Sequence, residues 1–301
     1  MLFLVLSISL CAYKLPGLLM EDRYDNWFSS LHAVLSRYLG NWPNLLMLAV
    51  LLFPLIVVYY LLSFFEGWLF GLLGIAMQAA ILFYSFGRGN LFEQTQTYLE
   101  HWREGQFQSS YHYATRYFRV PHSIDIDNVE QMHKTVRAGL FYQWFEQVFV
   151  IVFWFILAGP IAALFVRLLA LYEQNNSSLK PTDEQVPLQI QHALEWLPAR
   201  ILALTFAIAG NFTMCFNVWS SAILNWKMPT QDVLHTSGMA ALGVCEAGEK
   251  FDQKPPSTVK RDNSPDPALL LDYATELETI QKLVIRSLVV WILVLAVITI
   301  F

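Results

Sequence analysis

Residues 188–211 read LQIQHALEWLPARILALTFAIAGN, and within this stretch a polar amphipathic run becomes an apolar one at a single joint. The joint runs from Trp196 to Arg200. Tryptophan is typical of the headgroup boundary of a membrane, and Pro198 has no N–H to donate within a helix. Arg200 enters the apolar run, where an arginine needs a polar partner or water. The stretch therefore predicts a helix that enters a membrane and holds a polar contact there.

The composition extends this interpretation to the whole chain. Of its 301 residues, 55% are hydrophobic and only 14% are charged, which is too apolar for an ordinary soluble domain. The formal net charge of -5 offers no basic surface to nucleic acid, so we exclude that class of partner. The three cysteines are odd in number and lack CxxC spacing, so we interpret them as packing residues. We expect an all-α polytopic membrane protein.

The apolar runs predict about six transmembrane helices of roughly 20 residues each, together with amphipathic and cytoplasmic helices. Lysine and arginine gather in the polar regions, which places these regions in the cytoplasm. The expected regions, in chain order, are an N-terminal membrane region at 1–86 with three spans and an amphipathic helix at 22–39, a polar helical region at 87–139, a central membrane region at 140–224 that contains the joint, a polar and partly mobile loop with an amphipathic helix at 225–283, and a final span at 284–301.

Within the N-terminal region we expect the three spans at residues 1–20, 43–65 and 68–86. Local breaks refine the other regions. Gly105 divides the polar run 91–116 into a helical hairpin. In the central region we expect a span at 148–172 that is kinked at Gly159-Pro160, and we count the apolar run 201–224 as one further span.

Histidine and carboxylate clusters were tested as metal sites. His101, His112, His122 and His133 lack HExxH or i, i+4 spacing, so we predict no metal. The set Asp125, Asp127 and Glu130 could bind a cation, but Asp127 and Glu130 also have the spacing of a helix capping box, which is the favoured interpretation. Walker, Gly-x-Ser-x-Gly and Gly-x-Gly-x-x-Gly motifs are absent from the sequence, so we expect no cofactor.

Ionisable residues in apolar runs are the stronger functional signal. Glu146, Arg167 and Arg200 each cost about 3 kcal/mol or more to bury alone in a membrane. Two interpretations stay open: structural pairing, or a site in which the arginines hold an anionic ligand by bidentate hydrogen bonds.

Several motifs resemble the AmpE family. They are YQWFE from Tyr142, FWFILAGP from Phe153, ALFVR from Ala163, LEWLPAR from Leu194 and YSFGR from Tyr84. The resemblance implies a multi-pass protein of the bacterial inner membrane that takes part in the regulation of inducible β-lactamase. It also implies a link to cell-wall recycling, because the family is encoded beside an anhydromuramyl-peptide amidase.

The AmpE family is in turn similar to the membrane cobinamide-phosphate synthases, which share the Trp-x-Pro-Ala-Arg joint. Where those synthases carry acidic and asparagine residues, this chain has Tyr142, Gln143, Gln191 and His192, and Glu146 is the one carboxylate retained. A metal-dependent, ATP-driven reaction needs several carboxylates. The resemblance therefore implies a non-catalytic regulatory protein, with a synthase-like transferase as the alternative. A small transporter is the third possibility, based on Pro54, Gly159-Pro160 and Pro198 as helix-breaking points.

The predicted ligand-binding or coupling site contains no catalytic or metal-binding residue and consists of Tyr142, Glu146, Arg167, His192, Trp196 and Arg200. The partners that we expect are the lipid bilayer, an anionic small molecule such as a muropeptide, a protein of envelope signalling and a second copy of the chain.

Overall fold

Helices make up every regular element that the structure describes. The computed structural model describes residues 5–9, 13, 25–40, 42–65, 72–86, 91–118, 129–176, 185–244 and 267–300, and these residues contain no strand. The all-α prediction is thus confirmed for this part of the chain. The contacts divide the chain into two compact units, residues 1–90, 145–198 and 293–301, and residues 91–144 and 199–292.

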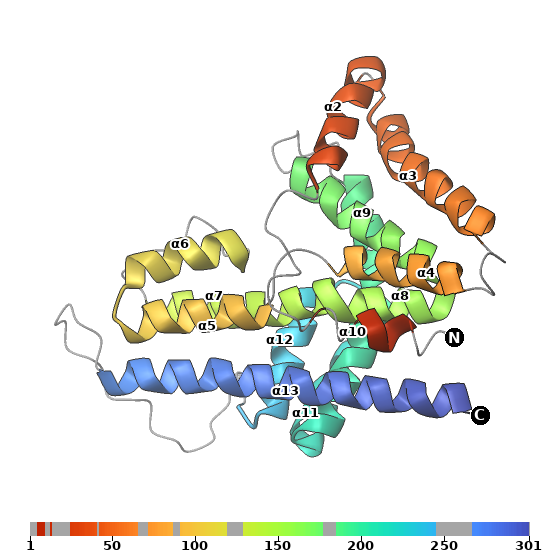
Figure 1. Ribbon diagram of the computed structural model, residues 1–301. Coiled ribbons are helices and arrows are strands. Elements are labelled where there is room, and N and C mark those ends of the chain that lie inside the picture. The colour runs from red at the N-terminus through yellow and green to blue at the C-terminus, as the bar shows by residue number, and fades with distance from the viewer. Residues whose placement is uncertain are drawn as a thin grey trace. The chain divides into compact units, whose positions relative to one another are not determined.

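The first unit is built from helices of both the N-terminal and the central region (Figure 1). Its elements are α2 (Asn26–Leu39), α3 (Pro43–Phe65), α4 (Leu72–Ser85), the π-helical turn η2 (Phe145–Phe149), α8 (Val150–Ala158), α9 (Pro160–Asn176) and the first part of α10 (Gln185–Ala209). The predicted amphipathic helix corresponds to α2, whose Phe28 is fully buried. The core of the unit joins α2, α3, α4 and α9 through Phe28, Leu46, Met47, Val50, Leu51, Leu55, Ile81, Leu164, Leu168, Leu169, Leu171 and Tyr172.

Helix α3 has the bounds of the predicted span, residues 43–65. Its 23 residues continue through Pro54 without a break, as is tolerated in membrane helices. The face opposite the core is also apolar, with Phe53, Ile56 and Tyr60 exposed. A helix that is apolar all round is typical of a membrane span.

Gly159 ends α8 completely, so the predicted continuous span at 148–172 is wrong. Gly159 has φ of 83°, a conformation that glycine adopts without the strain a side chain would cause. Its N–H donates to the Phe155 carbonyl at 2.9 Å, and Pro160 starts a new helix that packs back on α8. A glycine in the left-handed region followed by proline ends a helix. The sequence alone predicts only a kink at this position.

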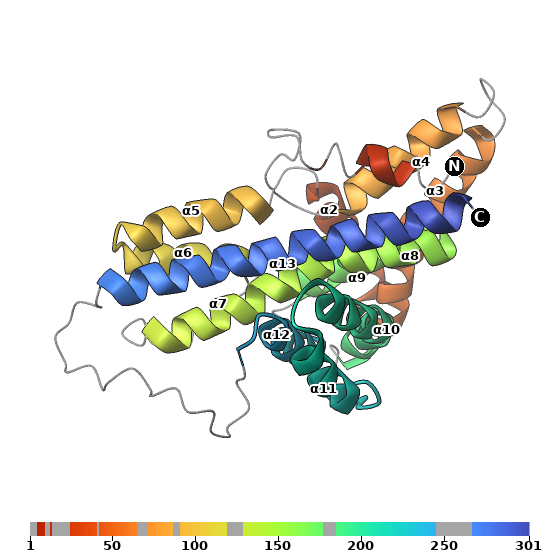
Figure 2. The ribbon, with the colours of Figure 1, turned by 90° about the horizontal axis from the view of Figure 1, so that it is seen from below.

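The second unit combines the polar region with the C-terminal half of the chain. Figure 2 shows α5, α6, α7 and α13 running alongside one another. Its elements are α5 (Leu91–Arg103), α6 (Phe107–Tyr117), α7 (Val129–Trp144), the end of α10, α11 (Phe212–Ala222), α12 (Thr230–Ala241) and most of α13 (Pro267–Ile300). Gly105, with φ of 72°, separates α5 from α6, which confirms the predicted helical hairpin.

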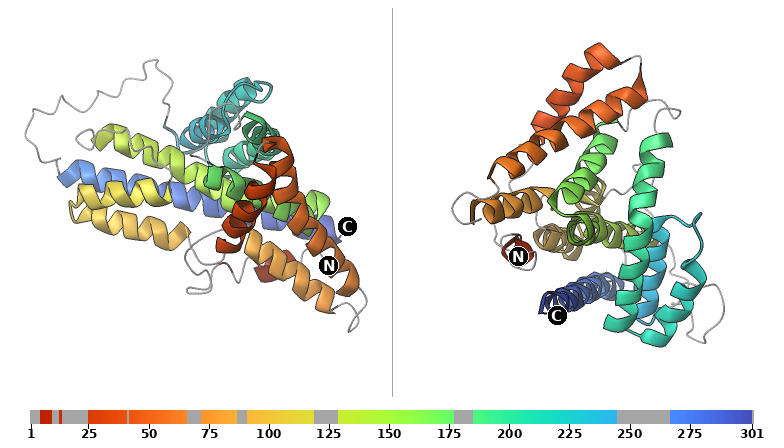
Figure 3. Two further views of the ribbon diagram at one scale, coloured as in Figure 1. Left: turned by 90° about the horizontal axis from the view of Figure 1, so that it is seen from above. Right: turned by 90° about the vertical axis from the view of Figure 1, so that its right-hand side faces the viewer.

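The apolar run 201–224 does not form one helix, and this part of the prediction is wrong. Helix α10 ends at Ala209, and Asn211 caps α11 by accepting a hydrogen bond from the Met214 N–H at 3.3 Å. Helix α11 then turns back toward α10. The Cys215 thiol of α11 donates to the Ala203 carbonyl of α10 at 3.5 Å. Figure 3 shows α10, α11 and α12 as neighbours. Asparagine is a strong helix N-cap, and Gly210 before it permits the close turn.

Three helices are long and apolar enough to cross a membrane: Pro43–Phe65, Gln131–Ala158 and Val186–Ala209, with Leu72–Ser85 as a shorter apolar helix. By length and composition these are the candidate spans in the described residues, and the predicted total of about six is not confirmed. Helix α13 joins the predicted amphipathic helix and the final span in a single helix of 34 residues. Of the predicted span 1–20, only residues 5–9 and 13 are described, and they are helical. The capping box at Asp127 and most of the polar loop before α13 lie outside the described residues.

Gly210 provides a test of the α10–α11 turn. A Cβ atom at Gly210 would lie 2.4 Å from the Ala241 carbonyl oxygen, which itself accepts a hydrogen bond from the Asn211 N–H at 2.7 Å. Because this contact is with backbone, we expect Gly210→Ala to destabilise the protein by about 1–3 kcal/mol. Thermal unfolding in detergent, followed by tryptophan fluorescence, measures the loss.

The matched control is Gly74→Ala in α4, where an added Cβ meets no atom within 4 Å. This substitution should leave the unfolding temperature unchanged or raise it slightly. Equal behaviour of the two variants would contradict the tight turn.

Candidate functional site

Arg167 is buried in the first unit and forms an ion pair with Asp25. Its Nη2 donates to Asp25 Oδ2 at 2.9 Å, and the exposed fractions of the two residues are 6% and 4%. The Tyr84 hydroxyl donates to Asp25 Oδ1 at 2.9 Å, and Trp27 Nε1 donates to the Tyr84 oxygen at 3.0 Å. One carboxylate therefore connects α9, the start of α2 and the end of α4.

Asp25 was not among the predicted site residues. In the sequence it belongs to the polar side of an amphipathic helix, which suggested exposure to solvent. It stands at the N-cap position of α2 but makes no capping hydrogen bond there. The useful signal was Arg167 itself, because a buried arginine requires an acceptor somewhere in the fold.

Glu146 lies in the π-helical turn η2 and is 7% exposed. A π-helical turn inserted into an α-helix is rare and is frequent at functional sites. A π-helical turn requires no distinctive residue type, so it could not be predicted from the sequence. The structure thus gives Glu146 an unusual backbone setting as well as burial.

His192 and Trp196 lie on α10 in the first unit, and both are partly buried. Close to them, Gln191 Nε2 donates to Glu195 Oε1 at 2.8 Å. The Trp154 indole N–H of α8 donates to the Leu194 carbonyl at 3.1 Å. This part of α10 is thus joined to α8 by a hydrogen bond to the helix backbone.

Arg200 belongs to the second unit and closes the α10–α11 hairpin. Its Nη2 donates to the Asn225 carbonyl at 2.9 Å, and its own carbonyl accepts from Trp219 Nε1 at 2.9 Å. The residue is 3% exposed. Helix α10 continues through Pro198, so the proline is not a break as the transporter interpretation required.

The six predicted site residues are divided between the two units. Glu146, Arg167, His192 and Trp196 belong to the first, and Tyr142 and Arg200 belong to the second. A single site formed by all six stays a prediction.

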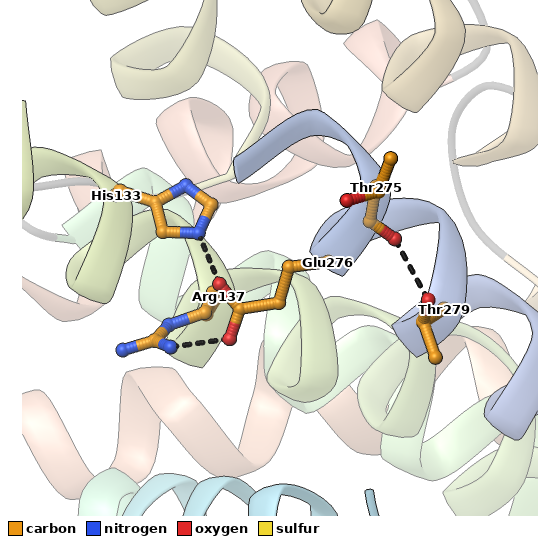
Figure 4. Close-up of polar contacts among 5 residues, drawn as sticks. All are labelled: His133, Arg137, Thr275, Glu276 and Thr279. Atoms are coloured by element: carbon orange, nitrogen blue, oxygen red, sulfur yellow. Dashed lines mark hydrogen bonds and ion pairs between the residues drawn. The ribbon is translucent and has the colours of Figure 1, made fainter. Parts of the chain in front are cut away.

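A second polar cluster, partly buried and absent from the predicted site, lies between α7 and α13. Figure 4 shows the Glu276 side chain reaching both His133 and Arg137. Glu276 Oε2 lies 2.7 Å from His133 Nε2, and Arg137 donates to Oε1. The His133 ring stacks on Tyr273 with centroids 4.1 Å apart. Arg103 of α5 and Glu278 of α13 form a further ion pair.

The charges in this cluster oppose the effect of burial. Burial alone would raise the pKa of Glu276, but the hydrogen bonds and positive charge of His133 and Arg137 outweigh it and lower that pKa. The cluster therefore favours the ionised carboxylate. Among the described residues, no three His, Cys, Asp or Glu side chains are grouped so that they could hold a metal ion.

The lowered pKa of Glu276 predicts a loss of stability in acid. A carboxyl group with a depressed pKa in the folded state stabilises that state above its unfolded pKa of about 4.3 and loses this contribution as the pH falls through the folded value. We expect Glu276→Gln to be less stable than wild type at neutral pH and to show a smaller loss between neutral and acid pH. Thermal unfolding as a function of pH measures both effects.

The control is Glu100→Gln, which removes an exposed carboxylate from α5. Its stability should follow that of wild type at every pH. If Glu276→Gln also followed wild type, the cluster would contribute nothing to the acid sensitivity.

Comparison with known proteins connects this arrangement to one family. The family model described as "Regulatory signalling modulator protein AmpE" matches residues 23–246, which is more than half of the chain. A similar curated protein is the "Cobalamin biosynthesis protein CobD" of Stutzerimonas stutzeri (strain A1501), with 25% identity over 206 residues. The match covers 67% of this chain and 64% of that protein, so the chain spans less than two thirds of the length of this relative. No solved structure matches.

The matched residues include the joint at Trp196–Arg200, the π-helical turn, Arg167 and Asp25. The protein belongs to the AmpE family of regulatory signalling modulator proteins.

Proposed function

We propose that the protein is a non-catalytic regulatory component of the bacterial inner membrane that couples the state of cell-wall recycling to β-lactamase induction. The observation that supports this proposal best is the Asp25–Arg167 pair, in a chain whose family is one of regulatory modulators. The signal would be an anionic muropeptide, recognised by Arg167.

Asp25 occupies the position that a ligand carboxylate would take. It accepts from the Arg167 guanidinium at 2.9 Å and from the Tyr84 hydroxyl at 2.9 Å. Guanidinium and hydroxyl donors are the groups that bind carboxylates in proteins, and arginine adds planar geometry. A muropeptide carboxylate could therefore replace Asp25 at the same donors.

Such a replacement would act on α2. Asp25 stands at the start of that helix, and the Phe28 N–H donates to its carbonyl at 3.0 Å. When Asp25 leaves Arg167, the start of α2 loses its ion pair with α9. A ligand that prefers one of two such arrangements shifts the population toward it, which is the basis of a sensor.

Glu146, His192 and Trp196 are the other members of the proposed site in the first unit, with Tyr142 and Arg200 as coupling residues in the second. The π-helical turn at Glu146 supports this choice, because such turns are frequent where helices carry function.

The test is isothermal titration of the full-length protein in nanodiscs with an anhydromuramyl tripeptide. We expect Arg167→Gln to weaken binding by tenfold or more, because a charge-assisted hydrogen bond contributes about 1.5–3 kcal/mol. Asp25→Asn should strengthen binding, because it removes the competing carboxylate. These two changes in opposite directions are specific to competition at Arg167.

Arg37→Gln is the matched control, since Arg37 is an exposed arginine of α2. The amidated tripeptide, which lacks the carboxylate, is the control ligand and should bind no variant. If wild type and Arg167→Gln bound the tripeptide equally, the proposed site would be refuted.

A second candidate function is a synthase-like transferase, and the similarity to the cobalamin biosynthesis protein favours it. It predicts magnesium-dependent ATP turnover by the purified protein in the presence of corrinoid and amino-alcohol substrates. A rate equal to that of the Glu146→Gln variant would remove this alternative.

A further inference from the structure

Helix α11 exposes two large apolar side chains on one face. Phe212 is 54% exposed and Phe216 is 39% exposed, and their rings stack with centroids 5.3 Å apart. The Trp219 ring, which is partly buried against Ala203, Ala222 and Val233, has its centroid 5.4 Å from that of Phe216. We call the exposed apolar residues of α11 and its flanking segments the aromatic edge, which consists of Ile208, Phe212, Phe216, Leu224 and Trp226.

The two ends of the apolar run 201–224 lie close together and would therefore be at the same depth in a membrane. Arg200 donates to the Asn225 carbonyl at 2.9 Å, and Trp219 donates to the Arg200 carbonyl at 2.9 Å. Helix α11 has 11 residues and is therefore about 16 Å long, about half of a hydrocarbon core of roughly 30 Å. The run therefore returns to its starting level, and α11 by itself is too short to cross.

A polar row lies beside the aromatic edge on the same helix. Thr213, Asn217, Ser220 and Ser221 are exposed. The Ser220 and Ser221 hydroxyls donate to the carbonyls of Asn217 and Val218 at 2.9 and 2.7 Å. A third face, with Cys215 and Ala222, is buried in the unit. A helix with adjacent apolar and polar exposed rows is suited to the boundary between lipid and water.

We propose that residues 201–226 form a helical hairpin that lies in the surface layer of one leaflet. The aromatic edge contacts the acyl chains and the polar row faces the headgroups. This proposal does not depend on the proposed function, and it uses only contacts within the second unit.

The residues that flank the aromatic edge favour the lipid bilayer as its contact. The aromatic edge includes Ile208 of α10, and Ile201 of the same helix is also exposed. Helix α10 is apolar enough to enter a membrane. Trp226 is exposed and is followed by the exposed Lys227. Tryptophan and lysine together are typical of the interface, where the ring lies at the headgroups and the ammonium reaches water. The proposal assigns residues 201–209 to this layer, although Val186–Ala209 has the length of a span.

The test measures the depth of nitroxide labels in the full-length protein. The three cysteines are replaced by serine, and the protein is reconstituted in nanodiscs of phosphatidylethanolamine and phosphatidylglycerol. Labels are attached through Phe216→Cys on the aromatic edge, Ser220→Cys on the polar row and Phe53→Cys on α3, and their accessibility to oxygen and to a water-soluble nickel complex is recorded. We expect the Phe216 position about 5–10 Å below the headgroups, the Ser220 position in contact with water and the Phe53 position deepest.

Three results would overturn the proposal. A Phe216 label as deep as the Phe53 label would mean that the run crosses the bilayer. A Phe216 label as accessible to water as the Ser220 label would mean that lipid does not cover the aromatic edge. Protection from both reagents would mean that a second copy or another protein covers the edge.

A second measurement does not depend on labels at the aromatic edge. In sealed vesicles, an impermeant maleimide should react from the same side with Thr213→Cys and Lys227→Cys, both exposed positions. Protection of the Thr213 position, or reaction from opposite sides, would contradict the hairpin.

Discussion

The ion pair between Asp25 and Arg167 is the constraint on which the first unit depends. An arginine in an apolar helix must find an acceptor, because an uncompensated buried charge costs about 3–5 kcal/mol. Asp25 meets this need across 142 positions in the sequence and also accepts from Tyr84. Three helices are therefore fixed by one carboxylate, and the apolar core around Phe28 and Leu168 packs against them. A contact of this kind is also the one that an anionic ligand can exchange.

The second unit solves the same problem with different acceptors. Arg200 uses the Asn225 carbonyl, which returns the chain to the start of the α10–α11 hairpin. Arg137 and His133 share the Glu276 carboxylate, which joins α7 to α13. In each case a charged side chain within a packed layer fixes the position of a segment far away in the chain. The polar residues of the protein thus determine its topology as much as the apolar ones do.

The sequence alone was sufficient to predict the structure where a local rule determines where a helix begins or ends. The bounds of α3 follow from an apolar run that ends at polar residues, and Gly105 separates α5 from α6 because glycine adopts positive φ. It was insufficient where a turn competes with hydropathy, as at Gly159 and at Gly210-Asn211, because apolar composition alone does not distinguish one crossing helix from two packed ones. Asp25 and Glu276 were missed because a contact between distant residues leaves no periodic pattern, and the π-helical turn at Glu146 has no residue signature.

The most direct measurement of the central claim is a double-mutant cycle on the buried pair, with Asp25→Asn, Arg167→Met and the double variant. Unfolding in detergent gives the free energy of each protein. Each single substitution leaves one partner buried without its counter-charge, so each should be strongly destabilising, and the double variant should lose less than their sum by about 0.5–3 kcal/mol. Additive losses would show that the two side chains act independently, and would contradict both the account of the fold and the proposed exchange with a ligand.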